Sequence, residues 1–210
     1  MWLLHLLFRA PLLFLLLVVP LLYSVIAHEV SHGWCAKYFG DDTAQRAGRL
    51  TLHPLPHLDL VGTLMLFLVG FGWAKPVPVD YGRLRPLRPG IFCVALAGCA
   101  TNLSIATLAL ALLQAQLVGL GSAPALMLAV VARINIILGA FNLIPIPPLD
   151  GSRIVLSLLP SGGQRALLRL ERYGFIILIV LLATGWLNPV IRAMEGLLLG
   201  LIAAMFGLAR

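Results

Sequence analysis

Long apolar runs, separated by short polar stretches, make up most of this chain. A helix that crosses a bilayer needs about 20 predominantly apolar residues. The runs predict about five such helices, at residues 6–39, 90–118, 124–144, 173–186 and 189–208. Pro20 predicts a kink in the first span, and the last two are short and joined by a tight turn. We therefore expect an all-α polytopic membrane protein, with residues 1–210 forming a single domain.

The stretch between the first two spans, residues 43–89, has a different pattern. It is punctuated by proline and glycine and holds one apolar stretch of roughly 12 residues, at 60–71, which is too short to cross a bilayer. Non-helical backbone at membrane depth must be shielded by protein or line a wet cavity. We expect a re-entrant, partly extended segment here.

The third span ends in a proline-rich stretch that cannot continue a helix, at residues 145–148. A short amphipathic helix is predicted at residues 152–159, followed by a basic linker at residues 162–172. Arg133 lies in the middle of the third span, where its charge needs a polar partner or a route to the interface.

Composition indicates that lipid is the solvent of this chain. Of its 210 residues, 60% are hydrophobic and only 11% are charged, whereas about 25% of the residues in soluble domains are charged. The first run resembles a secretory signal core, but no small-residue cleavage site follows it, so we interpret it as a retained helix. Cys35, Cys93 and Cys99 have no zinc-ribbon or disulfide spacing and are interpreted as small buried side chains.

Positive charge is concentrated in two stretches between the apolar spans. The net charge is +7, and eleven of the fifteen basic residues lie at positions 37–88 and 153–172. This is the positive-inside pattern, so no nucleic-acid partner is expected. The uncharged loop at residues 119–123 should face away from the cytoplasm. The N-terminus would then lie outside and the C-terminus inside a membrane that we expect to be a prokaryotic plasma membrane.

The strongest chemical signal is the sequence HEVSH at residues 28–32, near the end of the first span. Residues four apart on a helix share a face, so His28 and His32 can bind one Zn²⁺ ion. Glu29 can accept a proton from water beside the metal and return it to the leaving amine. Imidazole and carboxyl groups inside a span are costly and by default mark function. The motif therefore predicts a zinc centre.

A catalytic zinc ion normally has a third protein ligand, and Asp150 is the strongest candidate. It follows the third span directly, and the topology places it on the same side of the membrane as His32. Asp150 is equally suited to cap the helix that is predicted to start near Ser152. The spacing alone leaves both interpretations open.

Four motifs together resemble those of the site-two protease family of intramembrane zinc metalloproteases. They are HEVSH at 28–32, FGWAKPVPV at 71–79, AGCATN at 97–102 and NLIPIPPLDG at 142–151, in that family's order. The chain is similar to the minimal branch of the family, without a PDZ or appended regulatory domain. Cys99 departs from the family pattern, which has proline at that position.

The resemblance implies roles for the residues of these motifs. His28, His32 and Asp150 would bind one zinc ion, and Glu29 would be the general base. Asn142 would lie near the site, where its amide suits a developing oxyanion. A hydrogen bond to a neighbouring helix is the alternative for Asn142.

A site within the membrane must also hold an unwound substrate. The segment at 72–79 is expected to present an extended edge that pairs with the substrate backbone, since Pro76 and Pro78 suit an edge strand. A plain connecting loop is the alternative. Asn102 is expected either to contact substrate or to bond to a neighbouring helix. The expected substrate-binding residues are Gly72, Trp73, Lys75, Pro76, Val77, Pro78 and Asn102.

The predicted function is that of a zinc metalloendopeptidase that hydrolyses peptide bonds in or near transmembrane segments. The expected partners are single-span transmembrane proteins, the lipid bilayer and a regulatory membrane protein of unknown identity. A metal transporter with the same ligands is one alternative, but it would need polar groups along several spans. An inactive scaffold is another, but it is expected to lack Glu29 or a metal ligand.

Overall fold

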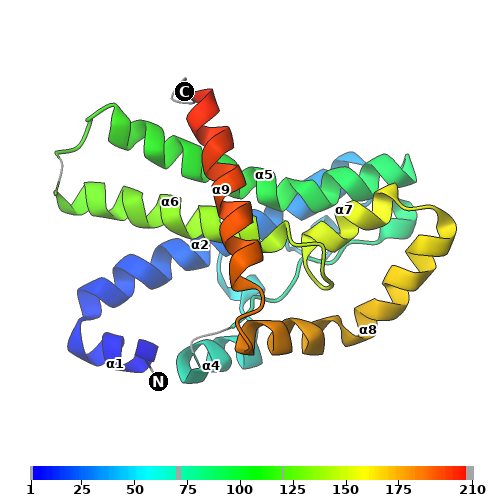
Figure 1. Ribbon diagram of the computed structural model, residues 1–210, viewed down its shortest axis with the longest axis horizontal. Helices are drawn as coiled ribbons and strands as arrows, with labels where there is room; N and C mark the ends of the chain where they lie inside the picture. Colours follow the sequence, from blue (N-terminus) through cyan, green and yellow to red (C-terminus); the bar gives the residue numbers. More distant parts are fainter. Residues whose placement is uncertain (1, 70–71, 120, 207–210) are drawn as a thin grey trace.

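The structure, a computed structural model, describes residues 2–69, 72–119 and 121–206, and within those ranges every regular element is helical. The long helices are α2 (Pro11–Tyr38), α5 (Leu87–Gln114), α6 (Ala123–Asn142), α8 (Ser161–Ala183) and α9 (Asn188–Met205) (Figure 1). The shorter elements are α1 (Trp2–Arg9), α3 (Thr43–Arg46), α4 (Leu60–Val69), α7 (Asp150–Leu158) and the 3-10 turns η1 (Leu55–His57) and η2 (Tyr81–Arg83). The predicted all-α fold is confirmed.

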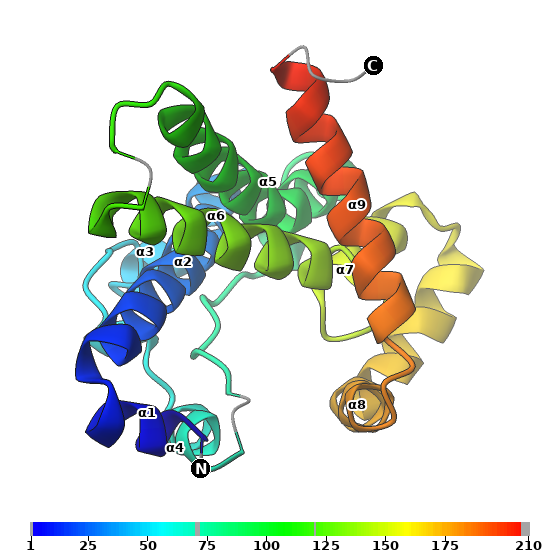
Figure 2. The ribbon, with the colours of Figure 1, turned by 60° about the vertical axis from the view of Figure 1, so that its left-hand side comes forward.

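Helices α2, α5 and α6 pack against one another and form the centre of the molecule (Figures 1 and 2). Small buried side chains on α5 and α6, such as Ala95, Ala106 and Ala132, let the backbones approach closely. In a lipid solvent such close packing and buried hydrogen bonds hold helices together, because apolar side chains gain little by leaving lipid. These three helices provide the frame on which the functional residues are placed.

Four of the described helices are long and apolar enough to cross a membrane: α2, α5, α6 and α9. They correspond to the first, second, third and fifth predicted spans. The first span is interrupted at Ala10, and Pro11 starts α2, because a proline nitrogen has no hydrogen for a helical bond and is tolerated only in the first turn. α2 then continues through Pro20 to Tyr38.

The predicted fourth span, residues 173–186, is not a separate helix. Its residues 173–183 form the second half of α8, and the basic linker forms the first half. The apolar part is therefore too short for α8 to count among the candidate spans. α9 also departs from a simple bundle, because it runs across α6 at a steep angle (Figures 1 and 2). The described residues thus supply four candidate spans where the sequence predicted about five.

The intramembrane arginine on α6 has its partner on α9. Nη1 of Arg133 lies 3.1 Å from Oε2 of Glu195, whose side chain is only 14% exposed. The pair joins the two helices and supplies the polar partner that an arginine in an apolar helix requires.

The short apolar stretch after η1 forms α4, which has ten residues and lies beside α1. Phe67 of α4 stacks on Phe14 of α2 with 6.1 Å between ring centroids. Residues 72–80 then have no regular secondary structure and run back toward α5 as an extended stretch (Figure 2). The segment is partly extended, as expected, and its apolar stretch is the helix α4; that it re-enters a bilayer stays a prediction.

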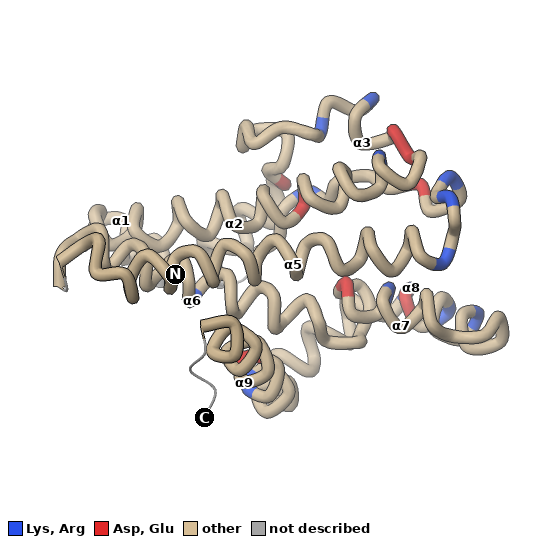
Figure 3. The backbone as a smooth tube through the Cα atoms, turned by 90° about the horizontal axis from the view of Figure 1, so that it is seen from above, with Lys and Arg blue, Asp and Glu red and all other residues tan. Residues whose placement is uncertain are grey.

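Charged side chains gather at one end of the molecule (Figure 3). The basic residues of the α3 region, of the start of α5 and of α7 and α8 lie at this end. The described part of the loop between α5 and α6, at the opposite end, carries no lysine or arginine. The two ends therefore differ in charge, as the positive-inside pattern requires, while the orientation itself stays a prediction.

Candidate metal centre

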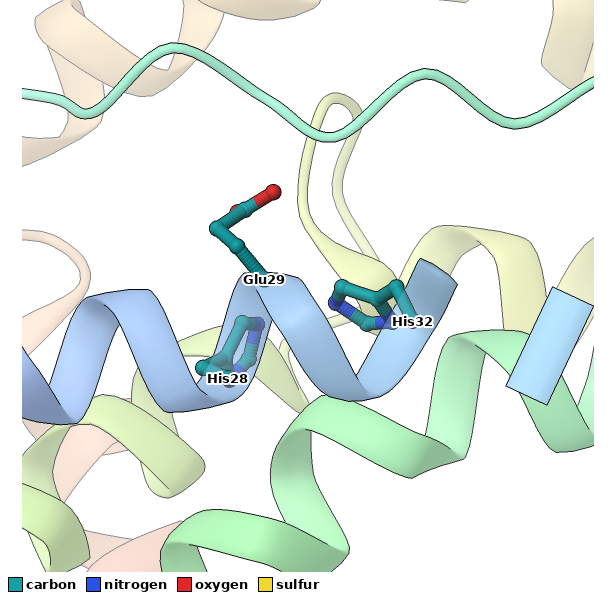
Figure 4. A group of neighbouring side chains, drawn as sticks. All are labelled: His28, Glu29 and His32. Atoms are coloured by element: carbon teal, nitrogen blue, oxygen red, sulfur yellow. The ribbon is translucent and has the colours of Figure 1, made fainter. Parts of the chain in front are cut away.

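Two imidazoles and a carboxylate lie together on one turn of α2. The rings of His28 and His32 are 4.7 Å apart between centroids, and these residues are only 5% and 8% exposed. Potential ligand atoms of His28, Glu29 and His32 all lie within 4.8 Å of one another. Figure 4 shows Glu29 pointing away from the two imidazoles, toward an extended stretch of the chain. The motif therefore forms one compact group of potential ligands.

Asp150 joins this group from α7. Its Oδ2 lies 3.0 Å from Nε2 of His28 and 3.2 Å from Nε2 of His32. Asp150 is the first residue of α7, and the preceding residue occupies the N-cap position without a side-chain capping bond. The turn before α7 requires Gly151, because a Cβ atom there would lie 2.2 Å from the carbonyl oxygen of Leu143. Of the two interpretations of Asp150, the structure therefore favours the ligand over the cap.

The cluster has the dimensions of a zinc site. Two ligands about 2.0–2.1 Å from a tetrahedral zinc ion lie about 3.3 Å from each other, close to the observed 3.0 and 3.2 Å. Oδ2 of Asp150 is sealed from solvent and accepts no hydrogen bond of acceptable geometry from the described part of the chain. A cation between this oxygen and the imidazoles of His28 and His32 would satisfy all three groups. Three protein ligands also leave a fourth position open, as in catalytic zinc sites.

Hydrogen bonds behind the imidazoles determine which nitrogens face the cluster. Nδ1 of His32 lies 2.7 Å from the carbonyl oxygen of Val94, which can only accept, so Nδ1 carries the proton. Nδ1 of His28 lies 2.5 Å from Oδ1 of Asn102. The amide nitrogen of Asn102 donates to Oδ1 of Asn135 at 2.8 Å, which leaves Oδ1 of Asn102 as the acceptor for His28. Both Nε2 atoms therefore keep a lone pair for a metal ion.

A buried polar chain supports this arrangement from behind. Nδ2 of Asn135 donates to Oγ of Ser24 and to the carbonyl oxygen of Val131, each at 2.8 Å. Asn102 and Asn135 are completely buried, and Ser24 is nearly so. A fully satisfied buried network of this kind rigidifies its surroundings. Sequence reasoning missed Asn135 and Ser24, although a polar residue in the middle of an apolar span was a signal for them.

The structure separates the two roles predicted for Asn102. Its side chain is buried, and its two polar atoms are bonded to His28 and Asn135. The helix-to-helix bond is therefore the observed one of the two expected contacts, while contact with a substrate stays a prediction. Asn102 is a positioning residue that orients the imidazole of His28.

Replacing Asn102 with alanine is expected to weaken zinc binding by about 10–100-fold, the usual effect of losing an outer-shell partner of a ligating histidine. Zinc affinity can be measured by competition with a chromophoric chelator on the purified protein in detergent. Ser104→Ala is the matched control, because the hydroxyl of Ser104, also on α5, donates to the carbonyl oxygen of Ala100 in its own helix. Equal zinc affinity of the alanine variant and the unmodified chain would leave Asn102 a purely structural role.

Gly98 provides the space for the first imidazole. A Cβ atom on Gly98 would lie 2.4 to 2.7 Å from three ring atoms of His28. Gly98 and Asn102 are one turn apart on α5, so a single face of α5 both admits the ring and bonds to it. The sequence singled out the motif that contains Gly98 but gave the glycine no role, because the neighbour that it accommodates comes from α2.

Gly98→Ala is therefore expected to displace His28 and to lower zinc affinity at least about tenfold, comparable to removing an outer-shell partner. Zinc content after purification, measured by elemental mass spectrometry, tests this, with circular dichroism to confirm helix content. Gly196→Ala on α9 is a matched control, since an added Cβ there meets no atom within 4 Å. Full zinc occupancy in Gly98→Ala would mean that the ring of His28 has room to move.

The extended segment at 72–79 holds the carboxylate of Glu29. Oε2 of Glu29 accepts a hydrogen bond of 2.8 Å from the backbone N–H of Val77, which leaves Oε1 for a proton. The side chain of Val77 is buried and packs toward Gly33, where an added Cβ would lie 3.0 Å from it. The N–H and the side chain of Val77 are thus both used inside the protein, and its contact with a substrate stays a prediction.

Both polar groups of the Lys75 backbone are hydrogen-bonded within the protein. Its N–H donates to the carbonyl oxygen of His57 at 2.8 Å, and its carbonyl oxygen accepts from Nη2 of Arg49 at 2.6 Å. Both His57 and Arg49 are buried, so the loop after α3 clamps the extended segment from within. The clamp fixes the register that brings the segment to Glu29.

The end of the segment is tied to the loop after α2. Oδ2 of Asp41 accepts from the backbone N–H of Asp80 at 2.7 Å, and Oδ1 accepts from the N–H and hydroxyl of Thr43 at 3.0 and 2.5 Å. Burial alone would raise the pKa of Asp41, but these hydrogen bonds hold that pKa below its usual value. The ionised carboxylate thus anchors the extended segment to the end of α2.

The other expected substrate residues lie at the surface of this segment or partly within it. Lys75 and Pro76 are exposed, and Gly72, Trp73 and Pro78 are partly buried. Trp73 packs edge-to-face against Phe175 of α8 with 5.3 Å between ring centroids. Their contact with a substrate stays a prediction.

Asn142 is the last residue of α6, and its amide donates to the carbonyl oxygen of Leu138 at 3.0 Å. In the part of the chain that the structure describes, no hydrogen bond joins it to His28, His32 or Asp150. Its proposed role as an oxyanion donor would require the amide to turn away from its own helix.

Comparison with known proteins identifies the family. The model described as "Peptidase family M50" matches residues 121–184, which include α7 and Asp150. The chain is 37% identical over 201 residues to YwhC of Bacillus subtilis, a proposed zinc metalloprotease, across 90% of this chain and 92% of that protein. The chain belongs to peptidase family M50.

Two further relatives are also named as zinc metalloproteases. Rip2 of Mycolicibacterium smegmatis, a proposed zinc metalloprotease, is 34% identical over 181 residues, covering 83% of this chain and 69% of that protein. The zinc metalloprotease MJ0392 of Methanocaldococcus jannaschii is 27% identical over 192 residues, covering 91% of this chain and 42% of that protein. No solved structure matches the chain.

The family membership confirms the resemblance found in the sequence motifs. Together with the four apolar helices and the His-Glu-His group, whose two histidines are buried, it makes the chain an integral membrane metallopeptidase whose donor set fits zinc.

Proposed function

We propose that this chain is an intramembrane zinc metalloprotease that hydrolyses peptide bonds in or near the transmembrane segments of other proteins. The observation that carries the proposal is the meeting of Nε2 of His28, Nε2 of His32 and Oδ2 of Asp150 within one buried cluster. These three atoms would hold the zinc ion.

The position of the cluster supports cleavage within the bilayer. α2 continues for ten residues beyond His28, to Tyr38, which corresponds to about 15 Å of helix. If the charged end of the molecule lies at the cytoplasmic surface, the zinc ion lies well below that surface. The N-terminus would then be outside, and the site would open toward the cytoplasm of a prokaryotic cell.

Glu29 is proposed as the general base. A bound zinc ion lowers the pKa of water and polarises a carbonyl group. Glu29 would take the proton at Oε1, while the bond from Val77 to Oε2 holds the carboxylate in place. The same oxygen would then return the proton to the departing amine. Asn142 is proposed to stabilise the oxyanion.

The extended segment is proposed to hold the unwound substrate. One edge of it, through Lys75 and Val77, is bonded to the protein. In the described structure no such bond occupies the backbone carbonyl groups of Ala74, Pro76 and Pro78, which form the alternating edge. A substrate strand can pair with these acceptors, and the two prolines lose nothing there, since an edge does not need their N–H.

The experiment is cleavage of a single-span substrate by the purified protein in lipid vesicles. We expect hydrolysis within or next to the substrate's membrane segment, loss of hydrolysis on chelation, and recovery on addition of zinc. Mass spectrometry of the fragments locates the cut. Metal flux across the vesicle membrane without hydrolysis would instead support a transporter with the same ligands.

The same preparation tests the substrate edge. A photo-cross-linking amino acid in place of the exposed Pro76 should capture the substrate. One in place of Leu52, which is exposed on the loop after α3, is the control and should not. Equal capture at both positions would contradict the proposed edge.

A further inference from the structure

The first half of α8 presents three arginines on one side. Arg165, Arg169 and Arg172 are spaced four and three residues apart, which places them on one face of a helix. All three are exposed. Within the described residues none of them is paired with a carboxylate, whereas Arg46 and Arg153 each have such a partner. These three residues form what we call the arginine face of α8.

This face lies where α8 changes from basic to apolar. Directly after Arg172 the helix continues with exposed apolar side chains, among them Phe175, Ile176 and Ile179. Figure 1 shows α8 turning a corner, with its first half at the end of the molecule where α7 ends. This is the end where the basic residues gather (Figure 3). In a membrane protein, the step from a basic to an apolar half marks the level of the lipid headgroups.

We propose that the arginine face of α8 binds the headgroups of anionic lipids. A guanidinium group presents donors in a planar fork that matches a phosphate group. A basic residue next to the membrane surface strengthens binding to anionic lipid by about fivefold. The three arginines have no competing carboxylate, so a negatively charged lipid surface is the partner that their charge fits.

The same face is linked mechanically to the metal centre. Glu171, on α8 between Arg169 and Arg172, pairs with Arg153 of α7. Nε2 of Gln164 donates to the carbonyl oxygen of Leu156, also in α7, at 3.1 Å. α7 carries Asp150 as its first residue. Headgroups bound to α8 would therefore steady the helix that presents the third ligand, and this second step rests on the proposed function.

The test compares the lipid preference of the unmodified full chain with that of its variants, each in lipid nanodiscs of phosphatidylcholine mixed with phosphatidylglycerol. Retained lipid is counted by native mass spectrometry. Changing all three arginines to glutamine should lower the preference for phosphatidylglycerol by about two orders of magnitude, since three effects of about fivefold multiply. The triple lysine variant keeps the charge but not the planar fork, so it should keep most of the preference. Arg46→Gln is the matched control, because Asp42 already neutralises Arg46, and it should change nothing.

An unchanged preference in the triple glutamine variant would overturn the proposal, and so would an equal loss in Arg46→Gln. Cleavage in the same discs tests the link to the metal centre. The triple glutamine variant should cleave more slowly in the mixed lipid, with its zinc content unchanged. Loss of lipid preference with undiminished cleavage would contradict the link to α7 alone. Absence of cleavage by the unmodified chain would contradict the proposed function. The lipid counts would still test whether the arginine face of α8 binds anionic headgroups.

Discussion

Glu29→Gln is expected to abolish peptide hydrolysis while leaving zinc in place. Glutamine keeps the shape of the side chain and can still accept the N–H of Val77 through its oxygen, but it cannot take a proton from water. Loss of a general base typically lowers the rate by about 10²–10⁴-fold. Neither His28 nor His32 is altered, so the metal affinity should stay nearly constant. The measurements are initial cleavage rates in vesicles and zinc content of the same samples.

Glu195→Gln is the control for this change. Glu195 is the other glutamate on a candidate span, and its partner is Arg133 on α6. Removing its charge perturbs a helix contact but no group of the metal centre, so cleavage should persist. Undiminished cleavage in Glu29→Gln would remove the general-base assignment. Loss of zinc along with cleavage would indicate that Glu29 is a ligand, as its closeness to both imidazoles permits.

Asp150→Ala is expected to remove zinc and activity together. The change takes away the only carboxylate oxygen that meets both Nε2 atoms in the described structure. Two imidazoles alone bind zinc weakly, so the loss of affinity should exceed the 10–100-fold typical of outer-shell partners. Folding should be affected little, because the change removes a buried charge rather than an apolar contact. Zinc titration by calorimetry on the purified protein measures the effect.

Asp59→Ala supplies a control for the alternative role of Asp150 as a helix cap. Oδ1 of Asp59 accepts the N–H of Gly62 at 2.7 Å at the start of α4, so its loss removes a true cap. That loss should reduce stability by about 1 kcal/mol without changing zinc affinity. If Asp150→Ala behaved in the same way, with full zinc occupancy, Asp150 would return to the role of a cap.

Sequence reasoning located the long helices to within a few residues where one long apolar run formed one element. The second and third predicted spans correspond to α5 and α6, and the amphipathic stretch corresponds to α7. It was wrong about residues 173–186, because apolar character alone did not reveal that the basic linker continues into the same helix. It also gave no indication that α9 crosses α6, since crossing angles depend on side-chain packing between helices.

The residues of the metal centre also divide into those that the sequence reveals and those that only the fold brings together. HEVSH places two imidazoles on one helix face by local geometry, so His28 and His32 could be found without a fold. The pairing of Asp150 with them was even with a capping role until the tertiary structure packed α7 against α5 and set Asp150 beside both imidazoles. The sequence also does not say which side of an extended segment faces the protein. Val77 was therefore grouped with the substrate-binding residues, although its N–H bonds to Glu29.

The sequence by itself determined that the chain lies in lipid, which helices form, and that two histidines share a face. These follow from local rules, because lipid requires each spanning segment to satisfy its own backbone and because helical periodicity is fixed. Only the tertiary structure decided that Asp150 meets both histidines and that Gly98 makes room for His28. It also decided that Asn102 accepts a hydrogen bond from Nδ1 of His28. Those contacts join segments far apart in the chain, and their geometry arises from how α2, α5, α6 and α7 pack, which no local pattern encodes.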